Sequence, residues 1–135
     1  MTIYQKLHFL NTLLIDDDQW IRNSLRLVFE SEGCPLTAVE TAEEGLQVVQ
    51  NTAVDVIICD YQLPGMDGLQ FFKEIRDRNI CAVKILITAY GSREVYAQAR
   101  FLGISDILEK PFTAGIIEQT LHRLLHSQNS SNDVS

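Results

Sequence analysis

The chain has 135 residues, of which 46% are hydrophobic, and this size and composition fit one globular domain with an apolar core. Its 18 acidic and 11 basic residues give a net charge of −7, which argues against a nucleic-acid-binding surface in these residues. The three cysteines lack metal-ligand spacing, so we expect reduced thiols and no zinc site. No apolar stretch could span a bilayer, so we expect a soluble cytoplasmic protein without contact with a membrane.

Short apolar runs alternate with longer amphipathic stretches over residues 12–126, which predicts repeated βαβ units around a parallel sheet. We expect residues 1–11 to be an N-terminal extension and the polar stretch 127–135 to be a disordered tail or the start of a linker. The predicted elements follow one another as strand 12–16, helix 19–31, strand 36–40, helix 41–50, strand 54–60, helix 69–78, strand 83–88, helix 92–102, strand 107–109 and a last helix after Thr113.

Some of these elements carry a specific signal in the sequence. Gly33 follows the first helix and is expected to end it. Thr41 and Glu44 have the spacing of a capping box, in which each side chain accepts a hydrogen bond from the other residue's backbone. Residues 54–60 are nearly continuous in apolar and β-branched side chains, which predicts a central strand buried on both faces. The helix at 92–102 has a thin apolar stripe, so we expect it to be weakly held and able to move.

Polar side chains stand where four of the predicted strands end. Asp16 and Asp17 end the first strand, Asp60 the third, and Thr88 and Lys110 the last two. Because ligands bind outside the carboxyl ends of parallel strands, we expect these side chains to meet at one site. Carboxylates are ligands that Mg²⁺ prefers, whereas a hydroxyl and an ammonium suit phosphoryl oxygens. The pattern therefore predicts that Asp60 attacks phosphorus and becomes an aspartyl phosphate.

Together these residues resemble, over about residues 12–126, the receiver domain of two-component response regulators, including the chemotaxis regulator. The turn at residues 63–68, Leu-Pro-Gly-Met-Asp-Gly, matches the family turn almost letter for letter. The resemblance implies a flavodoxin-like (βα)5 fold, with a doubly wound five-stranded parallel sheet of order 2-1-3-4-5. It also implies a signalling switch rather than an enzyme. Such a switch accepts its phosphoryl group from a histidine kinase or a histidine phosphotransfer protein and controls an output domain or a downstream protein.

The resemblance gives roles to individual residues. It makes Asp60 the phosphoacceptor, and the expected ligands of Mg²⁺ are Asp16, Asp17, Asp60 and the backbone carbonyl of Gln62. The phosphoryl group is expected to be bound by Thr88, its small neighbour Ala89, and Lys110. Lys110 precedes Pro111, and this peptide bond is usually cis in the family.

Three further positions are expected to affect how the signal is passed on and how long the phosphorylated state lasts. Ile107 stands where the family often has an aromatic partner for the switch hydroxyl of Thr88, so we expect the signal to pass through backbone movement instead. Gln62 and Tyr90 occupy the two variable positions that set the lifetime of the phosphorylated state in the family. We expect the Tyr90 side chain to obstruct the attacking water and to prolong that lifetime.

Two other function classes use similar residues. A haloacid-dehalogenase-like phosphatase also has a strand-tip aspartate, and Asp16 and Asp18 match its Asp-x-Asp arrangement, but the chain lacks the further acids and the cap that such an enzyme needs. The other class is a receiver-like module that binds a partner without being phosphorylated. Both the oligomeric state, monomer or homodimer, and the presence of an output domain remain open.

A few conspicuous side chains have simpler interpretations. Asp18 is expected to face solvent at a helix start, where its charge complements the helix dipole. His122 and His126 lie four residues apart on the last helix, a spacing that fits a solvated face better than a metal site. Trp20 is expected to pack near the site without a catalytic role.

Overall fold

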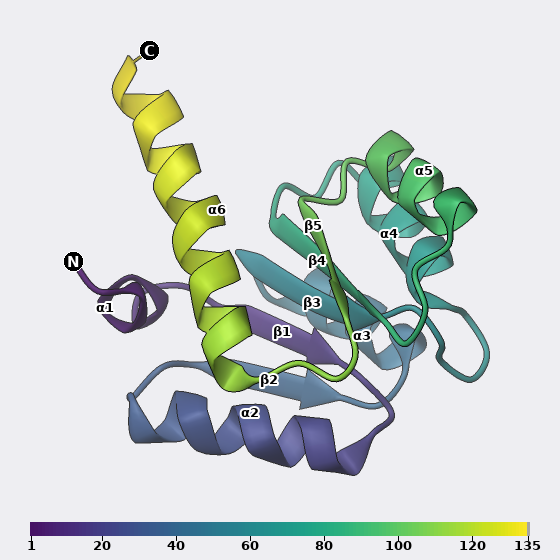
Figure 1. Cartoon of the computed structure of the whole chain (residues 1–135), viewed down its shortest axis with the longest axis horizontal. Coiled ribbons are helices and arrows are strands. Elements are labelled where there is room, and N and C mark those ends of the chain that lie inside the picture. Colours follow the sequence, from purple (N-terminus) through teal and green to yellow (C-terminus); the bar gives the residue numbers. More distant parts are fainter. Residues whose placement is uncertain (135) are drawn as a thin grey trace.

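The computed structural model describes the backbone of residues 1–134 and the side chains of residues 1–126. Its centre is a five-stranded parallel sheet with the order β2-β1-β3-β4-β5 (Figure 1). The strands are β1 (Thr12–Ile15), β2 (Leu36–Val39), β3 (Val56–Asp60), β4 (Val83–Thr88) and β5 (Asp106–Glu109). The predicted doubly wound fold and its strand order 2-1-3-4-5 are therefore confirmed.

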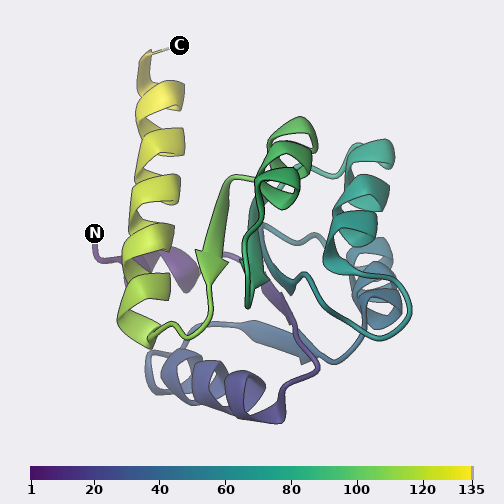
Figure 2. The same cartoon turned by 45° about the vertical axis from the view of Figure 1, so that its right-hand side comes forward.

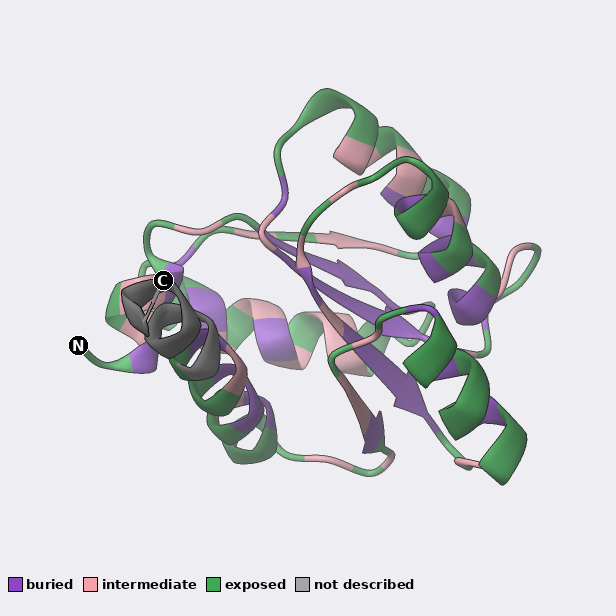
Figure 3. Cartoon of the chain, turned by 90° about the horizontal axis from the view of Figure 1, so that it is seen from above, coloured by how far each residue is buried: buried purple, intermediate pink, exposed green. Residues whose placement is uncertain are grey.

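Helices cover both faces of the sheet (Figure 2). One face is covered by α2 (Gln19–Ser31) and α6 (Ala114–Val134), and the other by α3 (Ala42–Asn51), α4 (Gly68–Asp77) and α5 (Arg93–Phe101). Because side chains alternate along a strand, Val56 and Ile58 of β3 enter the core under α2 and α6, whereas Ile57 and Cys59 enter the core under α3 and α4. All residues of β3 are buried, as predicted for the central strand (Figure 3).

Local sequence signals explain most of the helix ends. Gly33 has a φ of +69° and follows α2, which begins and ends where the sequence predicts. The Thr113 hydroxyl accepts a hydrogen bond from the Ile116 N–H at the start of α6. The capping prediction for α3 is half wrong. Thr41 accepts from the Glu44 N–H as expected, but the Glu44 carboxylate accepts from the Thr41 hydroxyl and not from its backbone.

The N-terminal extension contains a short helix, α1 (Ile3–Leu7), that the sequence analysis does not predict. Thr2 and Gln5 form its capping box, and Ile3 and Leu7 are buried in the core under α6. The Tyr4 hydroxyl donates a hydrogen bond of 3.2 Å to Glu118 of α6. Burial, together with the charge of Glu118, raises the pKa of Tyr4 to about 12, so this hydroxyl keeps its proton.

At the other end of the chain, the backbone of α6 continues to Val134. The predicted tail or linker at 127–135 falls on residues whose side chains lie outside the described part, and it stays a prediction. All three cysteines are free, as expected. Within the described residues, no helix is both long and apolar enough to cross a membrane.

Candidate functional site

The polar strand ends meet at the carboxyl edge of the sheet. Carboxylate oxygens of Asp16, Asp17 and Asp60 all lie within 4.8 Å of one another. The Lys110 Nζ lies 2.8 Å from Asp60 Oδ2 and 3.5 Å from Asp16 Oδ2. A backbone hydrogen bond joins the ends of β4 and β5, because the Lys110 N–H donates to the carbonyl of Thr88 at the end of β4. Three carboxylates and one ammonium therefore share one small volume.

Asp16 is fully buried and is only partly satisfied. Its Oδ1 accepts a hydrogen bond of 2.9 Å from the Asp18 N–H, but Oδ2 has no hydrogen-bond partner among the described residues. Burial raises the pKa of Asp16 to about 6, and the charge of Asp60 adds to this effect. The Lys110 ammonium at 3.5 Å is the one cation near this oxygen among the described residues, and it also serves Asp60. Three carboxylates that share a single ammonium leave negative charge uncompensated, so the acidic cluster fits a hard divalent metal ion.

Lys110 remains positively charged in this environment. Its partial burial acts to lower its pKa, but the hydrogen bond to Asp60 and the charges of Asp16 and Asp60 outweigh that effect and raise the pKa above its usual value. The ammonium is therefore a fixed positive charge beside Asp60, which is itself buried. The Lys110–Pro111 peptide bond is cis, as the family resemblance implies.

The turn after β3 holds Asp60 through two glycines. Gly65 has a φ of +76°, a conformation that side chains rarely adopt. At Gly68 a Cβ atom would lie 2.4 Å from the carbonyl oxygen of Asp60 and 2.9 Å from the Cα of Tyr61. Both contacts are with backbone atoms, which cannot move aside at low energetic cost. This close approach lets the Gly68 N–H donate to the Tyr61 carbonyl and starts α4 directly beside the strand end.

Thr88 points toward its own loop and not toward Asp60. Its hydroxyl donates a hydrogen bond of 3.0 Å to the Tyr90 carbonyl and accepts one of 3.2 Å from the Tyr90 N–H. The Tyr90 side chain is 80% exposed and is not part of the cavity lining, so its predicted effect on water stays a prediction. Ile107 is half-buried against the core under α3 and α4.

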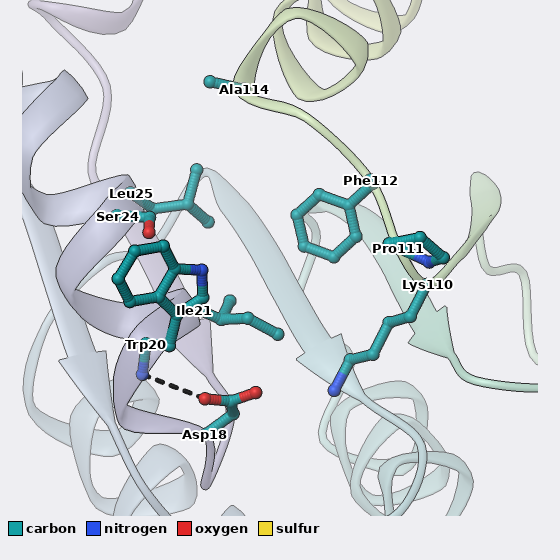
Figure 4. Close-up of a pocket in the computed structure, with 9 residues that line it drawn as sticks. All are labelled: Asp18, Trp20, Ile21, Ser24, Leu25, Lys110, Pro111, Phe112 and Ala114. Atoms are coloured by element: carbon teal, nitrogen blue, oxygen red, sulfur yellow. Dashed lines mark hydrogen bonds between the residues drawn. The ribbon is translucent and has the colours of Figure 1, made fainter.

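Two hollows adjoin the acidic cluster. A polar cavity of about 730 Å³ lies over it and brings together residues from four loops, namely Asp17, Asp18, Asp60, Tyr61, Gln62, Leu63, Pro64, Gly65, Asp67, Ala89 and Lys110. A smaller apolar hollow of about 310 Å³ lies between α2 and the loop after β5. In Figure 4, Trp20 and Phe112 stand on opposite sides of this second hollow, with Lys110 beneath them. The indole of Trp20 is 77% exposed, so it forms an open wall rather than part of the core.

The positions of Asp16 and Asp18 do not suit the Asp-x-Asp arrangement of a phosphatase. Asp18 is the exposed N-cap of α2, and its Oδ1 accepts from the Trp20 N–H. Asp17 joins Asp16 in the acidic cluster instead. His122 and His126 have stacked rings 5.9 Å apart on exposed positions of α6, and neither belongs to a three-ligand cluster within the described residues.

The family model "Response regulator receiver domain" matches residues 12–122. This chain belongs to that family. The receiver domain is 32% identical over 121 residues to the transcriptional regulatory protein GlrR of Escherichia coli strain K12, covering 90% of this chain and 27% of GlrR. It is also 32% identical to the KDP operon transcriptional regulatory protein KdpE of the same strain, covering 91% of this chain and 55% of KdpE.

A solved receiver domain has the same architecture. The CheY-like receiver domain protein of Methanospirillum hungatei JF-1 is 26% identical, with a TM-score of 0.83, and covers 90% of this chain and 97% of its own. The present chain spans only about a quarter to a half of the two curated regulators just named. The receiver domain is thus a regulatory phosphoacceptor module of two-component signalling, and its relatives are regulators with further domains.

The structure brings most of the predicted site residues together. Asp16, Asp17, Asp60 and Lys110 are in mutual reach, and Gln62 and Ala89 line the same cavity. Thr88 ends the neighbouring strand, but its hydroxyl donates to the Tyr90 carbonyl and not to the site. No pattern in the sequence predicts the apolar hollow beside the site. The one sequence signal for it is Trp20, a large aromatic residue at the start of an amphipathic helix.

Proposed function

We propose that this receiver domain accepts a phosphoryl group on Asp60 from a histidine kinase or a histidine phosphotransfer protein, with Mg²⁺ as cofactor. The ligands of Mg²⁺ would be Asp16, Asp17, Asp60 and the backbone carbonyl of Gln62. The observation that supports this most is the contact of 2.8 Å between the Lys110 ammonium and the buried Asp60 carboxylate, beneath a polar cavity. This places the acid, a fixed cation and space for a phosphoryl group together.

The chemistry is a transfer between two carriers. An oxygen of Asp60 attacks phosphorus, a new P–O bond forms, and the bond from phosphorus to the donor nitrogen breaks. Bound Mg²⁺ supplies positive charge that offsets repulsion between the phosphoryl oxygens and the carboxylates. Lys110, already in contact with Asp60, can bind a phosphoryl oxygen without a proton changing place.

Thr88 connects this transfer to a structural change. Its hydroxyl donates to the Tyr90 carbonyl and can donate to a phosphoryl oxygen only after that bond breaks. Phosphorylation should therefore rearrange the loop that leads into α5. Because Ile107 supplies no aromatic ring, the backbone of this loop would carry the signal to an output domain or a downstream protein. The domain would thus regulate other proteins from the cytoplasm and would not turn over a substrate.

The donor protein is expected to dock beside the site. The apolar hollow with its exposed Trp20 indole opens next to Lys110 and offers surface that a donor could cover (Figure 4). A donor bound there would present its phosphohistidine to Asp60 through the polar cavity.

Intact-protein mass spectrometry tests this proposal directly. Incubation with acetyl phosphate and Mg²⁺ should add one phosphoryl group to the native chain and none to Asp60→Asn. Asp77→Asn is the matched control, because Asp77 is an exposed acid on α4 outside the site, and it should be phosphorylated normally. Phosphorylation that persists in Asp60→Asn, or that is unaffected by removal of Mg²⁺ with a chelator, would refute the proposal.

A further inference from the structure

Three residues from different segments meet over the loop between β4 and α5. Gly91 belongs to the loop itself, Tyr96 lies in the first half of α5, and Glu109 is the last residue of β5. The Tyr96 hydroxyl donates a hydrogen bond of 3.2 Å to Glu109 Oε1 and so joins the helix to the strand. None of these residues is a proposed ligand of the phosphoryl group or of Mg²⁺. The contact therefore needs its own explanation.

Gly91 is the position over which this hydrogen bond closes. A Cβ atom there would lie 2.5 Å from Cε2 of Tyr96 and 2.8 Å from Oε1 of Glu109. The backbone of Gly91 is not in the left-handed region, so the glycine is needed for space and not for its conformational freedom. The tyrosine ring and the glutamate carboxylate thus lie directly against the backbone of the loop.

The same loop holds the Thr88 hydroxyl. This hydroxyl donates to the Tyr90 carbonyl at 3.0 Å and accepts from the Tyr90 N–H at 3.2 Å. The Tyr90 carbonyl belongs to the peptide bond that leads into Gly91, and Thr88 is the register partner of Glu109 in the sheet. A movement that takes this carbonyl away from Thr88 therefore displaces the backbone that Tyr96 and Glu109 cover.

The rest of α5 offers little resistance to such a movement. Its buried residues are Val95 and Ala99, both small. Burial raises the pKa of Tyr96, and the charge of Glu109 and the hydrogen bond to it act in the same direction, so the hydroxyl keeps its proton and remains a donor. Tyr96 is 42% exposed, and a partly exposed hydrogen bond stabilises one arrangement only modestly. Such a bond can restrain the loop and still yield to a bound phosphoryl group.

We propose that Tyr96, through Glu109, is a positioning residue that holds the loop 88–92 in its unphosphorylated arrangement and thereby slows phosphorylation of Asp60. This inference rests on the proposed function, in which Thr88 must leave the Tyr90 carbonyl to reach a phosphoryl oxygen. Without the restraint, the chain spends a larger fraction of time with Thr88 released, and phosphorylation becomes faster in proportion. In the phosphorylated chain Thr88 has already moved, so loss of phosphate is not accelerated.

Tyr96→Phe tests the proposal, because it removes the hydroxyl and keeps the ring. Intact-protein mass spectrometry follows phosphorylation by acetyl phosphate with Mg²⁺, and then phosphate loss after the donor is removed. Phosphorylation should become about two- to tenfold faster while phosphate loss is no faster, a combination that a mere loss of stability would not produce. Tyr4→Phe is the matched control, since Tyr4 also donates a bond of 3.2 Å to a glutamate, but between α1 and α6. It should leave both rates unchanged.

Changes on the other two members of the cluster give independent tests. Glu109→Gln keeps an acceptor for the Tyr96 hydroxyl and should stay close to the native rate, whereas Glu109→Ala should match Tyr96→Phe. Gly91→Ala should also accelerate phosphorylation, because its Cβ would push the tyrosine ring and the carboxylate apart. Tyr96→Phe combined with Gly91→Ala should add little to either change alone, since the same restraint is lost in both.

Amide hydrogen exchange of the unphosphorylated chain examines the loop without any phosphoryl transfer. The Tyr90 N–H, which is bonded to the Thr88 hydroxyl, should exchange faster in Tyr96→Phe, and the Ile58 N–H of the central strand should not. A native rate of phosphorylation in Tyr96→Phe overturns the proposal, even if exchange at Tyr90 changes, and leaves the proposed function standing. A native chain that is never phosphorylated on Asp60 overturns both, so the two failures are distinguishable.

Discussion

Replacing Asp16 by Asn should stabilise the metal-free domain at neutral pH, although Asp16 is a central residue of the site. The folded-state pKa of about 6 lies above the ordinary value of 3.8, because burial disfavours the charged carboxylate. Between these two values the folded state binds a proton that the unfolded state has released. Stability therefore decreases as pH rises through this window, and above about pH 6 the ionised group carries its full penalty.

The size of the effect follows from the two pKa values. A shift of one unit corresponds to about 1.4 kcal/mol, so a rise from 3.8 to about 6 corresponds to about 3 kcal/mol of destabilisation at neutral pH. Asn keeps an oxygen that can accept the Asp18 N–H bond and carries no charge. We therefore expect Asp16→Asn to be more stable than the native domain by about 2–3 kcal/mol near pH 7.5 and to differ little near pH 4.

Urea unfolding followed by far-UV circular dichroism, in the presence of a chelator, measures this difference at both pH values. Addition of Mg²⁺ should reduce this difference near neutral pH, because the native domain gains binding energy and the variant has lost a ligand; a gain of about 2.7 kcal/mol needs Mg²⁺ at about 100 times its Kd. The reasoning is wrong if Asp16→Asn is the less stable protein at neutral pH without metal, or if the two proteins show the same dependence on pH.

Three further outcomes are expected. Gly68→Ala should lose at least about 2 kcal/mol of stability and most phosphorylation, since its Cβ would meet backbone atoms beside Asp60, whereas Gly115→Ala on α6 should be neutral or slightly stabilising by urea unfolding. Tyr90→Ala should shorten the lifetime of the phosphorylated state, and a time course of phosphate release that matches the native chain would contradict this role of Tyr90. Leu7→Ala should cost about 2–5 kcal/mol, measured by the same unfolding assay, because Leu7 is fully buried, and a loss below about 1 kcal/mol would mean that α1 does not hold the core.

The sheet and the acidic cluster could be predicted because their signals are local. Each buried strand is a short apolar run, and the residue that ends it is adjacent in sequence. The strand order came from the family resemblance, and with it the ends of the strands place Asp16, Asp60 and Lys110 together. The helix boundaries near Gly33 and Thr113 also follow from residues within one turn of the helix end.

Other features depend on tertiary contacts. The helix α1 has five residues, too few to be stable alone, and it forms because Ile3 and Leu7 find apolar partners on α6. The direction of the Thr88 hydroxyl depends on the path of the Tyr90 backbone, which no periodicity describes. Likewise, the Glu44 carboxylate had two donors within reach at Thr41, and the sequence does not select between them.

The helix α1 packs into an apolar cluster that extends beyond the residues matched by the family model. The span shared with other receiver domains is 12–122, yet Ile3, Leu7 and Leu125 all belong to the same apolar cluster. A protein trimmed to the shared span would lose Ile3, Leu7 and Leu125 and would expose Leu121 of α6 and its apolar neighbours to water. In this chain, the apolar core therefore extends beyond both ends of the span that homology outlines.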